Sequence, residues 1–432
     1  MTDVAVATAP RSAVRSRLLA EEVVARVAFT LIALHVVDDN FLQPEPGTAA
    51  TGHLISGLVP LAVILAAAVG YRRLGSGFRA VLALVFGILG VLAGAEAAYY
   101  TANRAASGDD YTGYLSVAAG LPLLVIGSAT LWRSRRSNDG RLWRHVRRCL
   151  LAVAAAVAGM FVLFPISLAY VVTHTARAEV PRANLGAAYE DVEFTTRDGL
   201  LLKGWYVPSR NRAAVIAFPG RSGPQKQARM LAPQGYGVLL FDRRGEGASE
   251  GDPNVFGWGG ERDLLAAAAY LRSRPDVDRS RVGAIGLSVG GEMLIHAAAH
   301  SDAFAAIVTE GASGQSLRDD LANPRLVERL LDLPVQLSLT AAVAVLTNEL
   351  PPPNLRSEAP KIAPTSVFFI YGEHGQGGTE KRPNKAFYAA AHEPKQIWEV
   401  PGGEHIAGIT TRPREYDRRV VSFLDHALLP TD

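Results

Sequence analysis

The sequence contains very little cysteine and has almost no net charge. Cys149 is the single cysteine among 432 residues, so the chain can form neither an internal disulfide bond nor a cysteine-rich metal site. Its 44 basic residues nearly balance its 41 acidic residues, which leaves a formal net charge of +3. A charge this small does not favour an extended surface for nucleic acid or another polyanion. Composition therefore excludes a disulfide scaffold and argues against a nucleic-acid-binding protein.

Hydrophobic residues make up 49% of the sequence, but they are not spread evenly. Residues 1–175 are rich in alanine, leucine, valine, isoleucine and glycine, whereas residues 189–432 have the mixed composition of a globular domain. We expect a transmembrane helical region over 1–175, a linker over 176–188 and an α/β domain over 189–432.

Five apolar segments in the first region are candidates for membrane-spanning helices. They are Val23–Val37, Leu54–Tyr71, Phe78–Tyr100, Gly113–Trp132 and Cys149–Val172. The last four approach or exceed the roughly 20 residues that a helix needs to cross a bilayer. The first segment is weaker because Arg26 interrupts it and His35, Asp38 and Asp39 lie at its end. We predict an α-helical membrane bundle of about five helices.

The charges between these segments predict how they cross the membrane. Arginines occur before the first segment (Arg11, Arg15, Arg17), after the second (Arg72, Arg73, Arg79) and after the fourth (Arg133, Arg135, Arg136, Arg141, Arg144, Arg147, Arg148). The alternate loops carry Asp38, Asp39, Glu45, Asp109 and Asp110, with Arg104 as their one arginine. Arginine-rich loops are normally cytoplasmic. The expected location is the plasma membrane, with the N-terminus inside and the α/β domain on the outer face.

Three polar residues at the end of the first segment allow two interpretations. His35, Asp38 and Asp39 would share one face of a helix, as the ligands of a metal ion or the groups of a proton relay would. They would also be stable as hydrated groups at the outer interface of the bilayer. The second interpretation is favoured, and no metal site is predicted.

The second half contains a serine at the apex of a predicted sharp turn. The apolar run Val282–Leu287 predicts a strand, Gly286-Leu-Ser288-Val-Gly290 follows it, and an alanine-rich helix comes next. Side chains beside Ser288 would collide with backbone, which explains the two flanking glycines. We interpret Ser288 as a nucleophile rather than a residue of a structural turn. The N–H of Val289, in the first turn of the helix, would face an oxyanion.

Four sequence elements carry a resemblance to the α/β-hydrolase superfamily. They are Phe218-Pro-Gly220, Phe241-Asp-Arg-Arg-Gly-Glu-Gly-Ala-Ser249, Gly286-Leu-Ser-Val-Gly290 and Gly403-Glu-His405. In particular, the chain resembles the dienelactone-hydrolase and serine-aminopeptidase-like group, which includes membrane-anchored members. The resemblance implies an eight-stranded, mostly parallel sheet and hydrolysis of an ester, thioester or amide without a cofactor. It does not identify a substrate.

The resemblance also suggests the other catalytic groups. His405 lies in a glycine-rich loop after a predicted strand, where the family has its general base. The acid is ambiguous because Gly375 occupies the place of the usual aspartate. Glu373, Glu310 and Glu380 remain alternatives, as does the absence of an acid.

Two further expectations concern the surroundings of this site. The backbone N–H of Arg221, after Phe218-Pro-Gly220, would be the second oxyanion donor. An insertion over about 314–364 contains the apolar stretch Leu337–Leu346, which could form a lid, reach the bilayer or pack in the core.

The sequence therefore predicts a membrane-anchored serine hydrolase that forms an acyl-enzyme at Ser288. Its expected partners are the lipid bilayer and a small or lipid-like acyl substrate. An acyltransferase would use the same motifs, with a hydroxyl or thiol acceptor in place of water. The alternative from another class is a membrane sensor whose hydrolase-like domain binds a ligand without turnover, which the glycine at position 375 favours.

Overall fold

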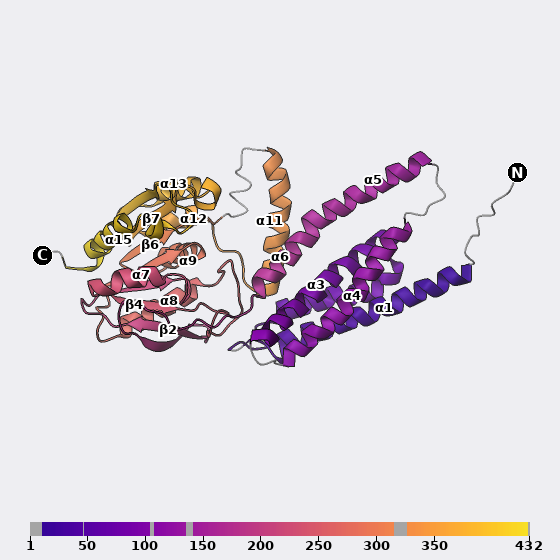
Figure 1. Cartoon of the computed structure of the whole chain (residues 1–432), viewed down its shortest axis with the longest axis horizontal. Helices are drawn as coiled ribbons and strands as arrows, with labels where there is room; N and C mark the ends of the chain where they lie inside the picture. The colour runs from indigo at the N-terminus through magenta and orange to yellow at the C-terminus, as the bar shows by residue number, and fades with distance from the viewer. Residues whose placement is uncertain (1–10, 46, 104–107, 135–140, 315–325, 431–432) are drawn as a thin grey trace. The chain divides into compact units, whose positions relative to one another are not determined.

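The computed structural model of the chain describes residues 11–45, 47–103, 108–134, 141–314 and 326–430 (Figure 1). They form two compact units. The helical unit comprises Met1–Pro44, Ala49–Ala176 and Pro334–Asn348 within those ranges, and the α/β unit comprises Glu45–Thr48, Arg177–Leu333 and Glu349–Asp432. The predicted insertion is thus divided between the two units, and its residues 315–325 lie outside the described ranges.

The helical unit consists of long helices with short connections. Its elements are α1 (Arg11–Val37), the π-turn η1 (Asp38–Leu42), α2 (Leu54–Gly70), η2 (Tyr71–Arg73), α3 (Ser76–Asn103), α4 (Gly108–Ser134), α5 (Arg141–Ala158), the π-turn η3 (Gly159–Leu163) and α6 (Phe164–Thr173). Among the described residues, three stretches are long and apolar enough to cross a membrane: Leu54–Arg73, Ser76–Tyr99 and Tyr111–Arg133. Three of the five predicted spans are therefore supported. The count of five is not confirmed, since α1 carries charged residues and the apolar helical stretch found in the last segment, Gly159–Thr173, is shorter than a span.

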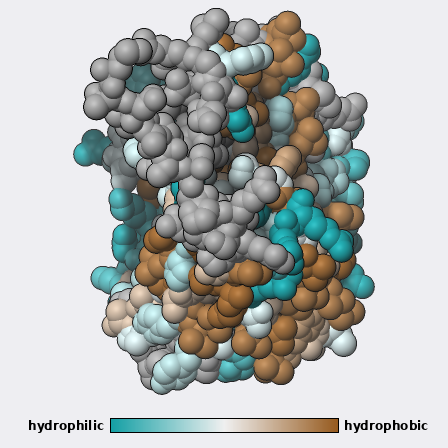
Figure 2. Space-filling view, turned by 90° about the vertical axis from the view of Figure 1, so that its right-hand side faces the viewer, coloured by the Kyte–Doolittle hydropathy of each residue, from teal (hydrophilic) through white to brown (hydrophobic). Residues whose placement is uncertain are grey.

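Small residues bring α3 and α4 unusually close together. A Cβ atom on Gly90 would lie 2.5 Å from the carbonyl oxygen of Ser116, and one on Gly120 would lie 2.7 Å from that of Gly87. Close backbone approach of this kind is the usual way in which helices pack in a membrane, because lipid provides no hydrophobic force to hold them together. The outward positions are apolar, and Figure 2 shows broad hydrophobic areas on the face that it presents.

Hydrogen bonds connect the polar residues at the end of α1 to other helices. The hydroxyl of Thr112 on α4 donates to Asp38 at 2.8 Å and lies 3.1 Å from Nδ1 of His35. Ser56 on α2 donates to Asn40 at 2.9 Å. Within the described ranges, no group of three or more histidine, cysteine, aspartate or glutamate side chains could hold a metal ion. The hydrogen bonds of Asp38 and Asn40 connect the end of α1 and η1 to α4 and α2.

The α/β unit is built on one eight-stranded sheet, as the sequence predicts. Its strands are β1 (Glu190–Thr195), β2 (Leu201–Val207), β3 (Ala214–Phe218), β4 (Gly237–Phe241), β5 (Val282–Leu287), β6 (Ala306–Glu310), β7 (Ser366–Gly372) and β8 (Lys395–Val400), in the order β1-β2-β4-β3-β5-β6-β7-β8. The pairs β1–β2 and β2–β4 are antiparallel, and the other five pairs are parallel. The carboxyl ends of β3 to β8 therefore meet at one edge, where open α/β sheets bind their ligands.

Helices cover both faces of this sheet (Figure 1). They are α7 (Gln225–Leu231), η4 (Ala232–Gln234), α8 (Glu261–Ser273), α9 (Val289–Ala299), α12 (Leu355–Glu358), η5 (Ala359–Ile362), η6 (Gly375–Gly378), α13 (Lys381–Ala390), α14 (Gly408–Thr411) and α15 (Pro413–Leu428); α11 (Leu326–Thr347) has residues in both units. One core lies under α8, α9 and α13, and the other under α7 and α15.

The strands belong to both cores, which explains their unbroken apolar runs. In β3, Ile216 and Phe218 face the first core, whereas Val215 and Ala217 face the second. Each buried valine, isoleucine or phenylalanine side chain contributes roughly 1.5–3 kcal/mol. A sheet packed on both faces holds its carboxyl edge rigidly, and the candidate site is built on that edge.

Candidate active site

Ser288 lies at a strained turn between β5 and α9. Its backbone has φ 52° and ψ −124°, a conformation that residues other than glycine rarely adopt. A Cβ on Gly286 would lie 2.5 Å from the carbonyl oxygen of Gly290, and one on Gly290 would lie 2.7 Å from Cδ of Pro219. The N–H of Ser288 donates to the carbonyl of Glu310 at 2.7 Å. Both glycines and this hydrogen bond hold the serine above the sheet edge.

The imidazole of His405 reaches the serine from the loop after β8. Nε2 of His405 lies 2.9 Å from Oγ of Ser288, within hydrogen-bond distance. The two residues are 117 positions apart in the sequence. The parallel sheet joins them because β5 and β8 both end at the same edge. A neutral imidazole with its proton on Nδ1 can accept the proton of the serine hydroxyl in this arrangement.

Glu380 is the carboxylate that contacts this histidine. Its Oε1 is hydrogen-bonded to Nδ1 of His405, and its Oε2 accepts the N–H of Gly372 at 3.1 Å. The side chain is fully buried. The turn η6 folds the chain back, with Gln376 at φ 47° and Gly377 at φ 69°, so that residue 380 returns to the end of β7.

The glycine at position 375 gains a physical explanation from this contact. A Cβ there would lie 2.2 Å from Oε2 of Glu380. The carboxylate of Glu380 thus occupies the space that a side chain at position 375 would need. Position 375 has no aspartate, and the carboxylate beside His405 belongs instead to Glu380, five residues further along the chain.

The other two candidate acids lie elsewhere. Glu373 is exposed and accepts the N–H of Gly402 at 2.8 Å. Glu310 is buried, but its oxygens accept the N–H of Gly408 and the hydroxyl of Tyr416, both at 2.8 Å. Neither has a described hydrogen bond to the imidazole. The structure therefore corrects both assignments, because Glu373 precedes the turn that redirects the chain and Glu310 has other donors.

The surroundings of His405 favour its protonated form. The hydrogen bond that Nδ1 of His405 donates to Glu380 raises the pKa of the imidazole above its usual value, and burial opposes this effect. The nearby charges of Glu380, Glu310 and Glu292 also raise the pKa. An imidazole held in this way is a stronger base than a free one. The carboxylate also stabilises the cation that forms when the serine gives up its proton.

The two predicted oxyanion donors differ in their availability. Val289 is the first residue of α9, where the backbone N–H groups of a helix have no partner within the helix. The N–H of Arg221 instead donates to Oδ1 of Asp242 at 3.1 Å. The guanidinium of Arg221 contacts the same carboxylate at 2.6 Å and lies over the ring of Trp205. Arg221 is not a free donor in this structure, so its predicted role requires the bond to Asp242 to break.

The segment Phe241–Ser249 is held in place by hydrogen bonds and ion pairs. Ser249 donates to the carbonyl of Asp242 at 2.6 Å. Arg244 forms ion pairs with Asp198 at 2.9 Å and with the fully buried Asp263 at 2.7 Å. These contacts fix the loop that contains Asp242, the hydrogen-bond partner of Arg221.

One half-buried carboxyl near the site, that of Glu292, was not predicted. Glu292 follows Ser288 by four residues on α9, and it accepts the N–H of Ser313 at 3.2 Å. Burial raises the pKa of Glu292. Its spacing from Ser288, one helical turn, is the signal that would have revealed it.

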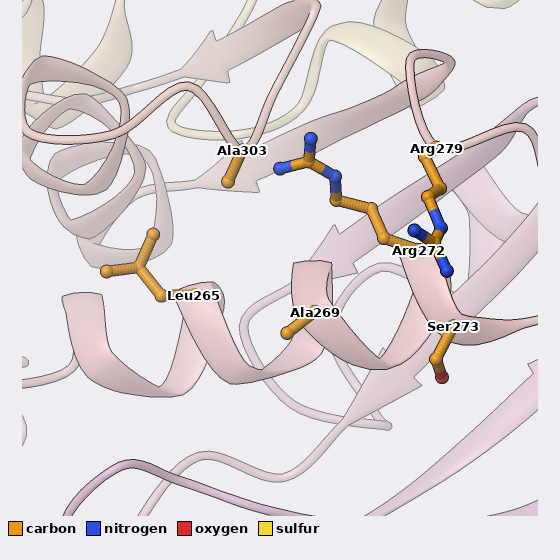
Figure 3. Close-up of a pocket in the computed structure, with 6 residues that line it drawn as sticks. All are labelled: Leu265, Ala269, Arg272, Ser273, Arg279 and Ala303. Carbon is orange, nitrogen blue, oxygen red and sulfur yellow. The ribbon is translucent and has the colours of Figure 1, made fainter.

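Two cavities of the α/β unit lie away from this site. One, of about 390 Å³, is lined by residues that include Leu265, Arg272, Arg279 and Ala303 (Figure 3). The other, of about 700 Å³, includes Ala305 and Ser366 at the amino ends of β6 and β7. Both lie toward the sheet edge opposite Ser288, and the chemistry at Ser288 does not use them.

The chain is similar to a peptidase family and to several individual proteins. The family model of the X-Pro dipeptidyl-peptidases (S15 family) matches residues 167–376. YfhR, an uncharacterized protein of Escherichia coli O157:H7, is 28% identical over 261 residues, which cover 56% of this chain and 82% of YfhR. Polyketide transferase grgF of a Penicillium species is 33% identical over 151 residues, covering 33% of this chain and 50% of that protein.

Two further similarities are to a thiohydrolase and to the solved structure of an esterase. Thiohydrolase aneE of Aspergillus aculeatus is 35% identical over 118 residues, which cover 26% of this chain and 37% of aneE. The solved structure of the Pyrococcus furiosus esterase Pf2001 is 20% identical, with a TM-score of 0.46, and the alignment covers 59% of this chain and 99% of the esterase.

The sheet order and the serine turn are those of an α/β-hydrolase fold. The match to the S15 peptidase family and the similarity to a thiohydrolase support a hydrolase of the serine type.

Proposed function

We propose that the protein is a membrane-anchored serine hydrolase that cleaves an ester, thioester or amide through an acyl-enzyme at Ser288. The observation that carries this proposal is the continuous chain of contacts from Oγ of Ser288 through His405 to Glu380. A serine hydroxyl becomes a competent nucleophile when a base can take its proton as it attacks. Glu380 takes the role of the acid in this proposal.

The arrangement supports a two-step acyl transfer. Oγ of Ser288 attacks the carbonyl carbon while its proton moves to Nε2 of His405, and the N–H of Val289 donates to the developing oxyanion. The imidazolium then protonates the leaving alcohol, thiol or amine as the bond to it breaks. A water molecule then loses a proton to Nε2 of His405 and attacks the acyl carbon. The bond from the acyl carbon to Oγ of Ser288 breaks, His405 returns the proton to Oγ, and the carboxylic acid is released.

The range of substrates follows from the chemistry and from the relatives. An X-Pro dipeptidyl-peptidase cleaves amides, a thiohydrolase cleaves thioesters and an esterase cleaves esters, and all three reactions proceed through the same tetrahedral oxyanion. The three apolar stretches of the helical unit support attachment to a membrane. We propose the plasma membrane, with the N-terminus inside and the α/β unit on the outer face.

Turnover of p-nitrophenyl acetate by the full-length protein in detergent tests this function. The parent should hydrolyse the ester, and Ser288→Ala should lose at least roughly 1,000-fold in kcat. Equal rates for the two proteins would exclude Ser288 as the nucleophile. A parent that binds a ligand but neither hydrolyses esters nor reacts with a fluorophosphonate would instead be a sensor.

A second candidate is acyl transfer, which the similarity to a polyketide transferase favours. The acyl-enzyme would then pass its acyl group to a hydroxyl or thiol acceptor instead of water. Adding an alcohol or thiol acceptor to the ester assay separates the two candidates. A transferase should form the new ester or thioester in preference to the free acid.

Protease accessibility in intact cells tests the proposed orientation. A protease added outside should cleave the α/β unit if it lies on the outer face. Full protection until the cells are opened would reverse the orientation, while the hydrolase assignment would stand.

A further inference from the structure

Glu310 holds the nucleophile and the base at the same time, through different atoms. Its carbonyl oxygen accepts the N–H of Ser288 at 2.7 Å. Its carboxylate accepts the N–H of Gly408 at 2.8 Å, three residues beyond His405. The residue lies at the last position of β6, between β5 and β7 in the sheet. A single strand end is therefore joined to both loops that carry the reacting side chains.

The carboxylate of Glu310 is also fixed from its other side. The hydroxyl of Tyr416 on α15 donates to its second oxygen at 2.8 Å, and Tyr416 is itself hydrogen-bonded to Gln227 on α7. Glu310 is 1% exposed and Tyr416 is fully buried. Since both oxygens have a donor, the side chain has little freedom to turn away from the histidine loop.

The residues that follow Glu310 continue this contact with the site. A Cβ on Gly311, which has φ 71°, would lie 3.0 Å from Nδ1 and Cε1 of His405, so the backbone at that position lies against the imidazole. The carbonyl of Ala312 accepts a hydrogen bond from Asn384, whose side chain also donates to the carbonyl of Glu380. The end of β6 thus contacts the backbone of Ser288, the loop and ring of His405, and Asn384, which bonds the backbone of Glu380.

We propose that Glu310 is a positioning residue that sets the distance between the nucleophile and the base of the proposed hydrolase. It does not take part in the proton transfers. Its carboxylate holds the loop after His405 through Gly408, and its backbone carbonyl holds Ser288. Together these two bonds fix the position of the histidine loop relative to Ser288. This inference rests on the proposed function, because it assigns Glu310 to the same reaction.

Glu310→Gln tests the proposal with the least change in shape. A glutamine amide can accept only one of the two hydrogen bonds, so the loop after His405 should loosen. The expected result for p-nitrophenyl acetate is a fall in kcat of roughly 10- to 100-fold, since displacements of about 1 Å cost that much, with little change in KM.

The pH profile separates positioning from a general loss of structure. The groups that act on Glu310 are Tyr416, Glu380 and His405, and burial raises the pKa of Glu310. The charge of Glu310 helps to raise the pKa of His405. Removing that charge should move the acidic limb of the kcat profile to lower pH.

Glu399→Gln is the matched control. Glu399 is also a strand glutamate that accepts a tyrosine hydroxyl, that of Tyr371 at 3.0 Å, but it has no bond to the histidine loop. It should keep the kcat and the pH profile of the parent. An equal loss in the two variants would overturn the proposal.

Each remaining outcome is decisive. A parental kcat in Glu310→Gln would overturn the proposal, as would a reduced kcat with an unmoved acidic limb and a much lower melting temperature. If Glu310→Gln does not fold, Tyr416→Phe replaces it, because it frees one oxygen of Glu310 and keeps the charge. That variant should lose several-fold in kcat, and an unchanged kcat would refute the role. An inactive parent would instead refute the hydrolase function.

Discussion

The α/β unit buries charged side chains with hydrogen-bond partners, whereas the helical unit exposes large apolar side chains. In the α/β unit, Glu310, Glu380 and Asp263 are at most 1% exposed, and each has at least two hydrogen-bond donors. In the helical unit, Val69 and Val125 are 66% and 68% exposed. The first pattern is that of a protein folded in water, where buried charge needs partners. The second is the pattern expected of helices that face lipid.

The difference concerns which unit contains buried charged groups that can act on a catalytic side chain. A buried carboxylate with fixed partners can shift the pKa of its neighbours, which the α/β unit uses at His405. The polar residues of the helical unit connect helices to one another instead. The contacts that form the candidate site therefore lie in the α/β unit.

The largest expected effect comes from removing the buried carboxylate at the histidine. Glu380→Gln should lower kcat for ester hydrolysis by roughly 10²- to 10⁴-fold, because the imidazolium loses its partner and the ring loses its fixed tautomer. Since Glu380 raises the pKa of His405, the acidic limb of the profile should move to lower pH. Glu373→Gln, on the same loop but exposed, should leave kcat near the parental value. The reverse order of the two variants would restore Glu373 as the acid.

A buried ion pair away from the site should affect stability rather than chemistry. Arg244→Leu would leave Asp263 charged, fully buried and without its main partner. The free energy of unfolding should fall by about 3–5 kcal/mol. Thermal melts of the full-length protein in detergent measure this loss. Arg419→Leu breaks an exposed pair with Glu415 and should change the melt very little.

A buried histidine should make the α/β unit sensitive to acid. Burial lowers the pKa of His296 to about 4, against an ordinary value of 6.5. Below pH 6.5 the unfolded chain therefore takes up a proton that the folded state resists, and stability falls as the pH approaches 4. Relative to the parent, His296→Leu should gain about 2–3 kcal/mol at pH 4.5 compared with pH 7.5. A constant difference between the two proteins across this range would contradict the assignment.

The helical unit should instead be sensitive to the size of its small residues. Gly120→Leu places a side chain where the backbone of α3 approaches, and should cost about 1–3 kcal/mol. Gly77→Leu is the matched control, because a Cβ on Gly77 meets nothing within 4 Å. Melts in detergent compare the two. Equal melting temperatures would show that α3 and α4 are not packed as described.

Much of the site could be predicted because its signals are local. The glycines around Ser288 and the loop before His405 are short motifs, and the apolar run of β5 coincides with the observed strand. The partner of His405 could not be predicted with the same certainty. Glu380 reaches the ring only because residues 376 and 377 adopt left-handed conformations, which hydrophobic periodicity does not encode. The partner of Arg221 was equally hidden, since Asp242 lies 21 positions away.

The fold was predictable for a different reason. Strands buried on both faces have continuous apolar sequences, as β3, β4 and β5 do. The helical unit was less well predicted at α1 and α5. Both helices are present, but each contains several charged residues, so neither is apolar enough along its length to count as a candidate span. Composition alone does not tell whether such a helix crosses the bilayer.

Mass spectrometry of the protein after reaction with a fluorophosphonate tests the central claim most directly. The reagent phosphonylates a serine whose proton a neighbouring base can accept. The account predicts one adduct, on the peptide that contains Ser288, that forms in the parent but not in Ser288→Ala and forms far more slowly in His405→Ala. A parent that stays unmodified, or an adduct on another residue, would contradict it.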